Sequence, residues 1–224
     1  MLNRFNKLLL ILSIVFLFGC HDPELPEYLK YDWYAHFTLG DEEYSMFTNS
    51  LYNEYEPYIA GFQSYGSIIY PDGTKEITFL ALTSGMNTAS DEMDSVVGFE
   101  YQIATTNQEL IALNGKSKEE KINTLISYFR NRRFVPGDGN SVFILIADKY
   151  GRSYNNKVFS NWPYAVYLDY DIVVVDVGVF EHPLEGDVLQ VRAKFQAVVR
   201  EKIAHGTDQP LTADVQMYFP IPFE

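Results

Sequence analysis

Histidine, serine and cysteine are the side chains best suited to zinc binding or nucleophilic catalysis, and their spacing indicates whether they could act together. The four histidines, His21, His36, His182 and His205, lie far apart, with no H-x-x-x-H pattern or cysteine partner to form a zinc site. No G-x-S-x-G segment provides the strained turn that exposes a nucleophilic serine. The sequence therefore predicts no metal site and no bound cofactor, and it gives little support for nucleophilic hydrolysis.

Carboxylates are plentiful, with 30 Asp and Glu residues. Asp91, Glu92 and Asp94 form one cluster, and Asp138 with Asn140 form another, so oxygen ligands suitable for Ca²⁺ exist. Neither cluster has EF-hand spacing, and a solvated acidic loop and a glycine-rich turn are the simpler interpretations. A glycoside hydrolase needs two carboxylates at a defined separation across a cleft, and the sequence does not select such a pair.

Aromatic side chains suggest a binding surface. Trp33, Tyr52, Tyr55, Tyr58 and Trp162 are our candidates for a platform on which sugar rings stack. The alternative is that these rings pack in a core, because tyrosine is common in β-strands.

Cys20 is the only cysteine, and it follows a short apolar segment at the N-terminus. Arg4 and Lys7 precede residues 8–18, an apolar run too short to cross about 30 Å of hydrocarbon as a helix. Residues 17–20, Leu-Phe-Gly-Cys, resemble the lipobox of bacterial lipoproteins, although a phenylalanine stands where a small residue is usual. This resemblance implies that residues 1–19 are a signal peptide and that Cys20 carries lipid, including palmitate.

The mature chain that would remain after removal of this leader is acidic, and it begins with a proline-containing segment. Removing Arg4 and Lys7 with the leader makes the formal charge two units more negative than −13, so nucleic acid is a poor partner. Residues 20–31 are acidic and contain two prolines, which predicts a flexible linker between the lipid and the domain. With its one cysteine lipidated, the domain would form no disulfide.

Alternating apolar and polar residues predict most of the domain to be β-strand. Residues 33–39 alternate in this way, and so do residues 188–200 and 211–219, which we expect to form an antiparallel hairpin with one solvated face. Residues 96–104 read as a further strand. The apolar run 142–147 predicts a strand buried on both faces, and the polar segment 84–94 predicts a loop.

One helix is expected. Residues 117–120, Ser-Lys-Glu-Glu, have the form of a capping box, and Ile122, Leu125, Ile126 and Phe129 then form one apolar stripe. Arg130, Arg132 and Arg133 follow, either complementing the helix dipole or forming a cationic ligand site.

Together these elements predict a mainly β, antiparallel β-sandwich at residues 32–224, with a closed β-barrel as the alternative. In outline the chain resembles uncharacterised β-sandwich lipoproteins of Bacteroidota, a resemblance that implies no particular activity. We expect a membrane-tethered, non-enzymatic binding lipoprotein of the outer membrane, facing the periplasm or the cell surface, with a polysaccharide or a surface protein as partner. A pilus-type or envelope-assembly subunit is the alternative, and a glycoside hydrolase is the third.

Overall fold

Strands make up most of the protein in a computed structural model, which describes residues 29, 32–48, 58–69, 76–89, 96–113, 115–138, 140–161, 164–182, 186–203 and 205–221. The predicted mainly β, antiparallel architecture is confirmed, and all strand pairs are antiparallel. The elements are β1 (Trp33–Leu39), β2 (Glu42–Thr48), β3 (Tyr58–Ile69), β4 (Glu76–Ala89), β5 (Val96–Thr105), α2 (Gln108–Ile111), α3 (Lys118–Phe129), β6 (Arg133–Phe134), β7 (Asn140–Ala147), β8 (Ser153–Asn155), β9 (Lys157–Asn161), β10 (Tyr164–Tyr167), β11 (Tyr170–His182), β12 (Gly186–Glu201) and β13 (Asp208–Pro220).

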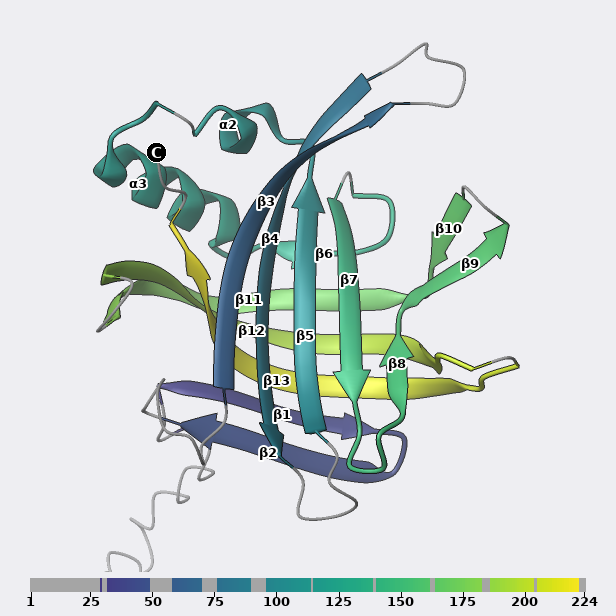
Figure 1. The fold of residues 1–224 in the computed structure, drawn as a ribbon. Helices are drawn as coiled ribbons and strands as arrows, with labels where there is room; N and C mark the ends of the chain where they lie inside the picture. The colour runs from purple at the N-terminus through teal and green to yellow at the C-terminus, as the bar shows by residue number, and fades with distance from the viewer. Residues whose placement is uncertain are drawn as a thin grey trace, which may run out of the picture.

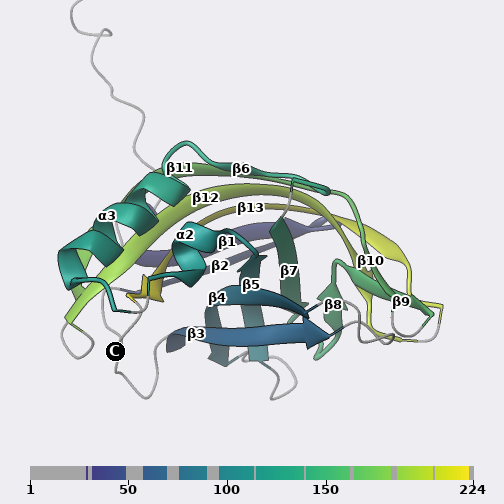
Figure 2. The same cartoon turned by 90° about the horizontal axis from the view of Figure 1, so that it is seen from above.

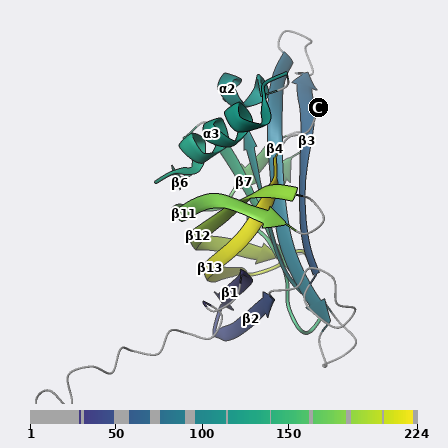
Figure 3. The same ribbon diagram turned by 90° about the vertical axis from the view of Figure 1, so that its left-hand side faces the viewer.

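One continuous sheet folds over to make two layers. Its strand order is β2-β1-β13-β12-β8-β7-β5-β4-β3, with β11 and β6 beside β12, while β9 and β10 form a separate hairpin. Strand β8 joins the halves, because it pairs with β7 along its length and with β12 only at Arg200 and Glu201. In Figure 1 the strands β3, β4, β5 and β7 cross those of the other half, and Figures 2 and 3 show the two layers face to face.

The predicted hairpin of β12 and β13 supplies much of the core. Val191 is opposite Met217, and Phe195 is opposite Ala213. These residues are buried, whereas Lys194 on the other face is exposed, as the alternation predicts. Burial of such large apolar side chains is the main favourable contribution to folding, since no disulfide is available.

Helix α3 lies at one end of the layers, with its inner face against the core. The predicted capping box is present: Ser117 Oγ accepts a hydrogen bond from the Glu120 N–H, and the Glu120 carboxylate accepts one from the Ser117 N–H. The buried stripe differs from the prediction. It consists of Lys121, Leu125, Tyr128 and Phe129, whereas Ile122 and Ile126 are only partly buried.

Two further predictions about strands are corrected. Residues 84–89, expected in a loop, continue β4, because their backbone pairs with β3 on one side and β5 on the other. Strand β7 is buried on one face only: Val142, Ile144 and Ile146 are in the core, and the outward residues between them are half-buried. Strands β4 and β7 are the two neighbours of β5, so both corrections concern the surface that these three strands share.

Most of the predicted leader and linker lies outside the described residues, including Cys20, residues 1–19 and all of residues 20–31 except Leu29. Within the part of the chain that the structure describes, no helix has the length and apolar character needed to cross a membrane.

Candidate functional site

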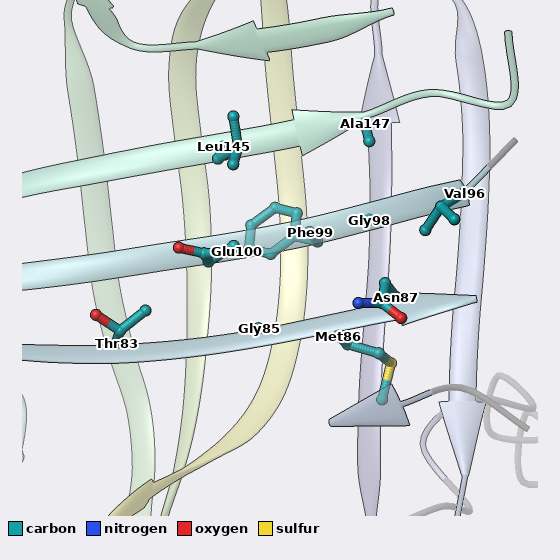
Figure 4. Close-up of a pocket in the computed structure, with 10 residues that line it drawn as sticks. All are labelled: Thr83, Gly85, Met86, Asn87, Val96, Gly98, Phe99, Glu100, Leu145 and Ala147. Carbon is teal, nitrogen blue, oxygen red and sulfur yellow. The ribbon is translucent and has the colours of Figure 1, made fainter. Parts of the chain in front are cut away.

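A groove of about 200 Å³ lies on the outer face of β4, β5 and β7, the face turned away from the opposite layer. Figure 4 shows the three strands side by side with the residues that line the groove. Outward-facing residues Thr83, Gly85 and Asn87 come from β4, Val96, Gly98 and Glu100 from β5, and Leu145 and Ala147 from β7.

The groove exists because small residues stand beside one another in the strand register. Gly85 is opposite Glu100, and Gly98 lies between Asn87 and Ala147. A Cβ atom at Gly85 would lie 3.2 Å from both Cβ and Cγ of Glu100, so a side chain there would displace the glutamate. A Cβ atom at Gly98 would lie 3.6 Å from the Asn87 Cβ and 3.7 Å from the Ala147 Cβ, so an alanine would fit there in ordinary van der Waals contact. Glycine at these two positions gives the groove its floor.

Glu100 is the only ionisable side chain among the described outward-facing residues of β4, β5 and β7. It is partly buried between Gly85 and Leu145, and partial burial raises the pKa of its carboxyl because water solvates the charged form less well there. No ion pair within the described residues compensates for this loss of solvation. The carboxylate is therefore suited to accept a proton, a hydrogen bond or a cation.

The surroundings of Glu100 are apolar with a few uncharged polar groups. Val96 is 50% exposed and Leu145 is half-buried, so both offer apolar surface at the groove. Thr83 is 1% exposed, and its Oγ1 accepts a hydrogen bond of 2.9 Å from the Gln102 Nε2. The groove can thus hold an apolar group and pair one positive charge with Glu100.

The Asp148 carboxylate is fully buried and, unlike that of Glu100, has hydrogen-bond donors around it. Its two oxygens accept hydrogen bonds from the backbone N–H groups of Tyr150 and Arg152, from the Arg152 Nε and from the Tyr154 hydroxyl. These four donors fix the turn after β7. A buried carboxylate that is satisfied in this way is part of the fold.

Trp33, one of the predicted platform residues, lies in the interior. Its side chain is 0% exposed, and its ring packs edge-on against Phe180 at 5.0 Å and Tyr218 at 5.3 Å between centroids. It therefore offers no surface to a ligand, and the core alternative applies to it. Tyr58 begins β3, but the position of its side chain is not described; Tyr52, Tyr55 and Trp162 lie outside the described residues.

Among the described residues, the histidines and acidic side chains considered as metal ligands do not come together. The His36 Nδ1 lies 2.7 Å from the Ser45 Oγ, and His205 occupies a turn with φ of 65°. Asp138 accepts a hydrogen bond from the Asn140 N–H at 2.8 Å, which matches the simpler interpretation as a turn. His21 and residues 91–94 lie outside the described residues. Among the residues that are described, no group of three His, Cys, Asp or Glu side chains could hold a metal ion.

The arginines after α3 do not form one cluster. Arg133 makes two hydrogen bonds of 2.7 Å with the Asp171 carboxylate, which lowers the pKa of Asp171. Arg130 is the C-cap residue of α3. Arg132 instead packs over aromatic rings.

Comparison with known proteins assigns no family: no family model, curated protein or solved structure matches the chain. The groove residues Gly85, Gly98 and Glu100 were not predicted from the sequence. The available signal was that Gly98 and Glu100 share one face of the predicted strand 96–104, but Gly85 fell in a segment assigned to a loop.

Proposed function

We propose that the protein is a membrane-tethered lipoprotein that binds a partner protein, and that the groove at Glu100 receives a positively charged side chain of that partner. The observation that carries the proposal is one partly buried carboxylate, without a described counter-charge, in an otherwise uncharged groove. The resemblance of residues 17–20 to a lipobox supports the tether.

The energetic reason concerns the solvation of Glu100. Withdrawing a carboxylate from water costs free energy, and an opposite charge at hydrogen-bonding distance offsets that cost. A Lys or Arg side chain of a partner would supply this charge while its methylene stem contacts Val96 and Leu145. Electrostatic complementarity of this kind favours the correct partner over neutral or anionic competitors.

The size of the groove favours a side chain over a free ligand. Pockets for small molecules usually enclose about 300–1,000 Å³, and the Glu100 groove, at about 200 Å³, is smaller. It has room for one side chain projecting from a larger surface. This supports a protein partner as the occupant.

The order of the strands bears on the alternative of a pilus-type subunit. Donor-strand exchange needs an exposed sheet edge next to a removable terminal strand. Here β1 lies between β2 and β13, and β13 lies between β1 and β12, so both terminal strands of the described sheet are interior. This arrangement favours a binding module over strand exchange.

A peptide-binding experiment tests the groove. The full chain in detergent would be titrated with short peptides of Ala, Gly, Ser and Val that carry one central Lys, Gln or Glu. The Lys peptide should bind best, and Glu100→Gln should weaken its binding about tenfold, equivalent to about 1.4 kcal/mol. Glu181→Gln, which changes an exposed acid on β11, is the matched control and should have no effect.

Other outcomes would contradict the proposal. Equal binding of the three peptides would remove the role of Glu100. Binding on a glycan array that Glu100→Gln leaves unchanged would favour a polysaccharide ligand at another surface, and turnover of glycosides would favour the hydrolase. The tether is tested separately: wild type should incorporate labelled palmitate, Cys20→Ser should not, and labelling of both or of neither would exclude the lipobox interpretation.

A further inference from the structure

A second hollow, of about 450 Å³, lies between α2 and α3 and shares no residue with the Glu100 groove. Figures 1 and 2 show the two helices next to each other at one end of the layers. This volume falls within the usual range of about 300–1,000 Å³ for small-molecule sites. The cleft between α2 and α3 is therefore large enough to accommodate a small ligand.

Arg132 supplies the positive charge of this cleft. Its guanidinium lies 4.9 Å from the ring centre of Tyr128 and 5.7 Å from that of Phe134, so the two rings orient it. Its backbone is fixed as well, since its N–H donates to the Phe129 carbonyl and its carbonyl accepts from the Val174 N–H. Unlike Arg133, it forms no ion pair with any described residue.

The other polar groups of the cleft are mostly uncharged. Asn123 and Ser127 lie on the exposed side of α3, and their side chains make no hydrogen bond within the described residues. The Asn107 Oδ1 accepts a hydrogen bond from the Glu109 N–H, which leaves its NH₂ group as a donor. Amides and hydroxyls of this kind match the hydroxyl groups of a polar ligand.

Glu109 limits the charge that the cleft can accept. Its carboxylate lines the same cleft, so a ligand with several negative charges meets repulsion, whereas a ligand hydroxyl can donate a hydrogen bond to it. A planar carboxylate fits the forked N–H groups of a guanidinium better than a tetrahedral dianion would in these surroundings.

From this arrangement we propose that the cleft between α2 and α3 binds a small monocarboxylate that carries several hydroxyl groups, either an acidic sugar or an open-chain hydroxy acid. Arg132 pairs with the carboxylate through two hydrogen bonds. Asn107, Asn123 and Ser127 contact the hydroxyls. This site is independent of the proposed partner-binding groove, so failure of one leaves the other intact.

Calorimetric titration of the full chain in detergent tests the site with glucuronate, gluconate, glucose and phosphate. Glucuronate or gluconate should bind, and glucose and phosphate should bind at least about tenfold more weakly because each lacks one half of the recognised chemistry. Arg132→Lys, which keeps the charge but loses the fork, should raise the Kd of the carboxylate about tenfold. Arg130→Gln, outside the cleft, is the control and should change nothing.

A second variant keeps the test decisive if Arg132→Lys lowers the folded fraction. Asn123→Asp adds a negative charge on an exposed helix position and should weaken carboxylate binding while the melting temperature stays unchanged. Binding of glucuronate alone would identify an acidic sugar, and binding of gluconate alone an open-chain acid. The proposal is overturned if neither carboxylate binds, if glucose or phosphate binds as well as the carboxylates, or if carboxylate affinity is the same in both variants as in wild type.

Discussion

Replacing Phe129 with alanine tests how α3 is held against the core. The Phe129 side chain is 0% exposed, stacks on Phe219 with 5.5 Å between ring centres, and meets Tyr128 edge-on at 5.1 Å. Truncation of a buried phenylalanine costs about 3–5 kcal/mol, because the apolar transfer energy is lost and a cavity remains. For a domain of this size, that loss lowers the melting temperature by about 6–20 °C.

The control is Lys118→Ala at the other end of the same helix. Lys118 is 61% exposed, and its Nζ lies 2.7 Å from the Asp187 Oδ2, a surface pair worth about 0.2–1 kcal/mol. Urea denaturation of both variants should therefore show a loss several times larger for Phe129→Ala. Losses within about 1 kcal/mol of each other would refute the position that we assign to α3.

Three further substitutions examine the cap and two carboxylates. Ser117→Ala removes the capping box and should cost about 0.5–2 kcal/mol in the same denaturation assay; no loss would mean that the cap is not formed in solution. Arg133 lowers the pKa of Asp171, so the pair stabilises the fold above the ordinary aspartate pKa, and this contribution is lost as the pH falls through the lowered value. Asp171→Asn should abolish this part of the loss of stability at acidic pH. An unchanged dependence of stability on pH would contradict the pairing. Burial raises the pKa of Glu100, so ionised Glu100 destabilises the fold at neutral pH. Glu100→Gln should therefore melt at the same or a higher temperature than wild type at pH 7, and any advantage should disappear as the pH falls below the ordinary glutamate pKa. A clear loss of stability at pH 7 would count against the environment assigned to Glu100.

The hairpin and the helix could be predicted from the sequence because local pattern and final structure agree there. Along residues 188–200, every second side chain enters the core, and the predicted partner strand lies opposite in register. Ser117 and Glu120 form their cap within a single turn, so no long-range information is needed. The phase of the helix stripe was less predictable, since the buried Lys121 reads as a polar residue even though its long apolar stem can pack.

The candidate site could not be predicted because it depends on strand register. Ser84, Gly85 and Asn87 have the composition of a loop, but pairing with β3 and β5 holds them in a strand. The environment of Glu100 is set by Gly85 on one side and Leu145 on the other, and these residues are distant in sequence. Only the folded sheet brings a glycine beside that carboxylate.

Charge reversal at Glu100 provides the most direct test of the proposed binding function. The affinity of the Lys and Glu peptides would be measured against wild type and against Glu100→Lys, with Gly98→Ala as a variant that partly fills the groove without strain. We predict that wild type prefers the Lys peptide, that Glu100→Lys prefers the Glu peptide, and that Gly98→Ala weakens binding while the protein remains folded. Unchanged peptide preference in folded Glu100→Lys would contradict the account, because the groove would then not recognise charge through this residue.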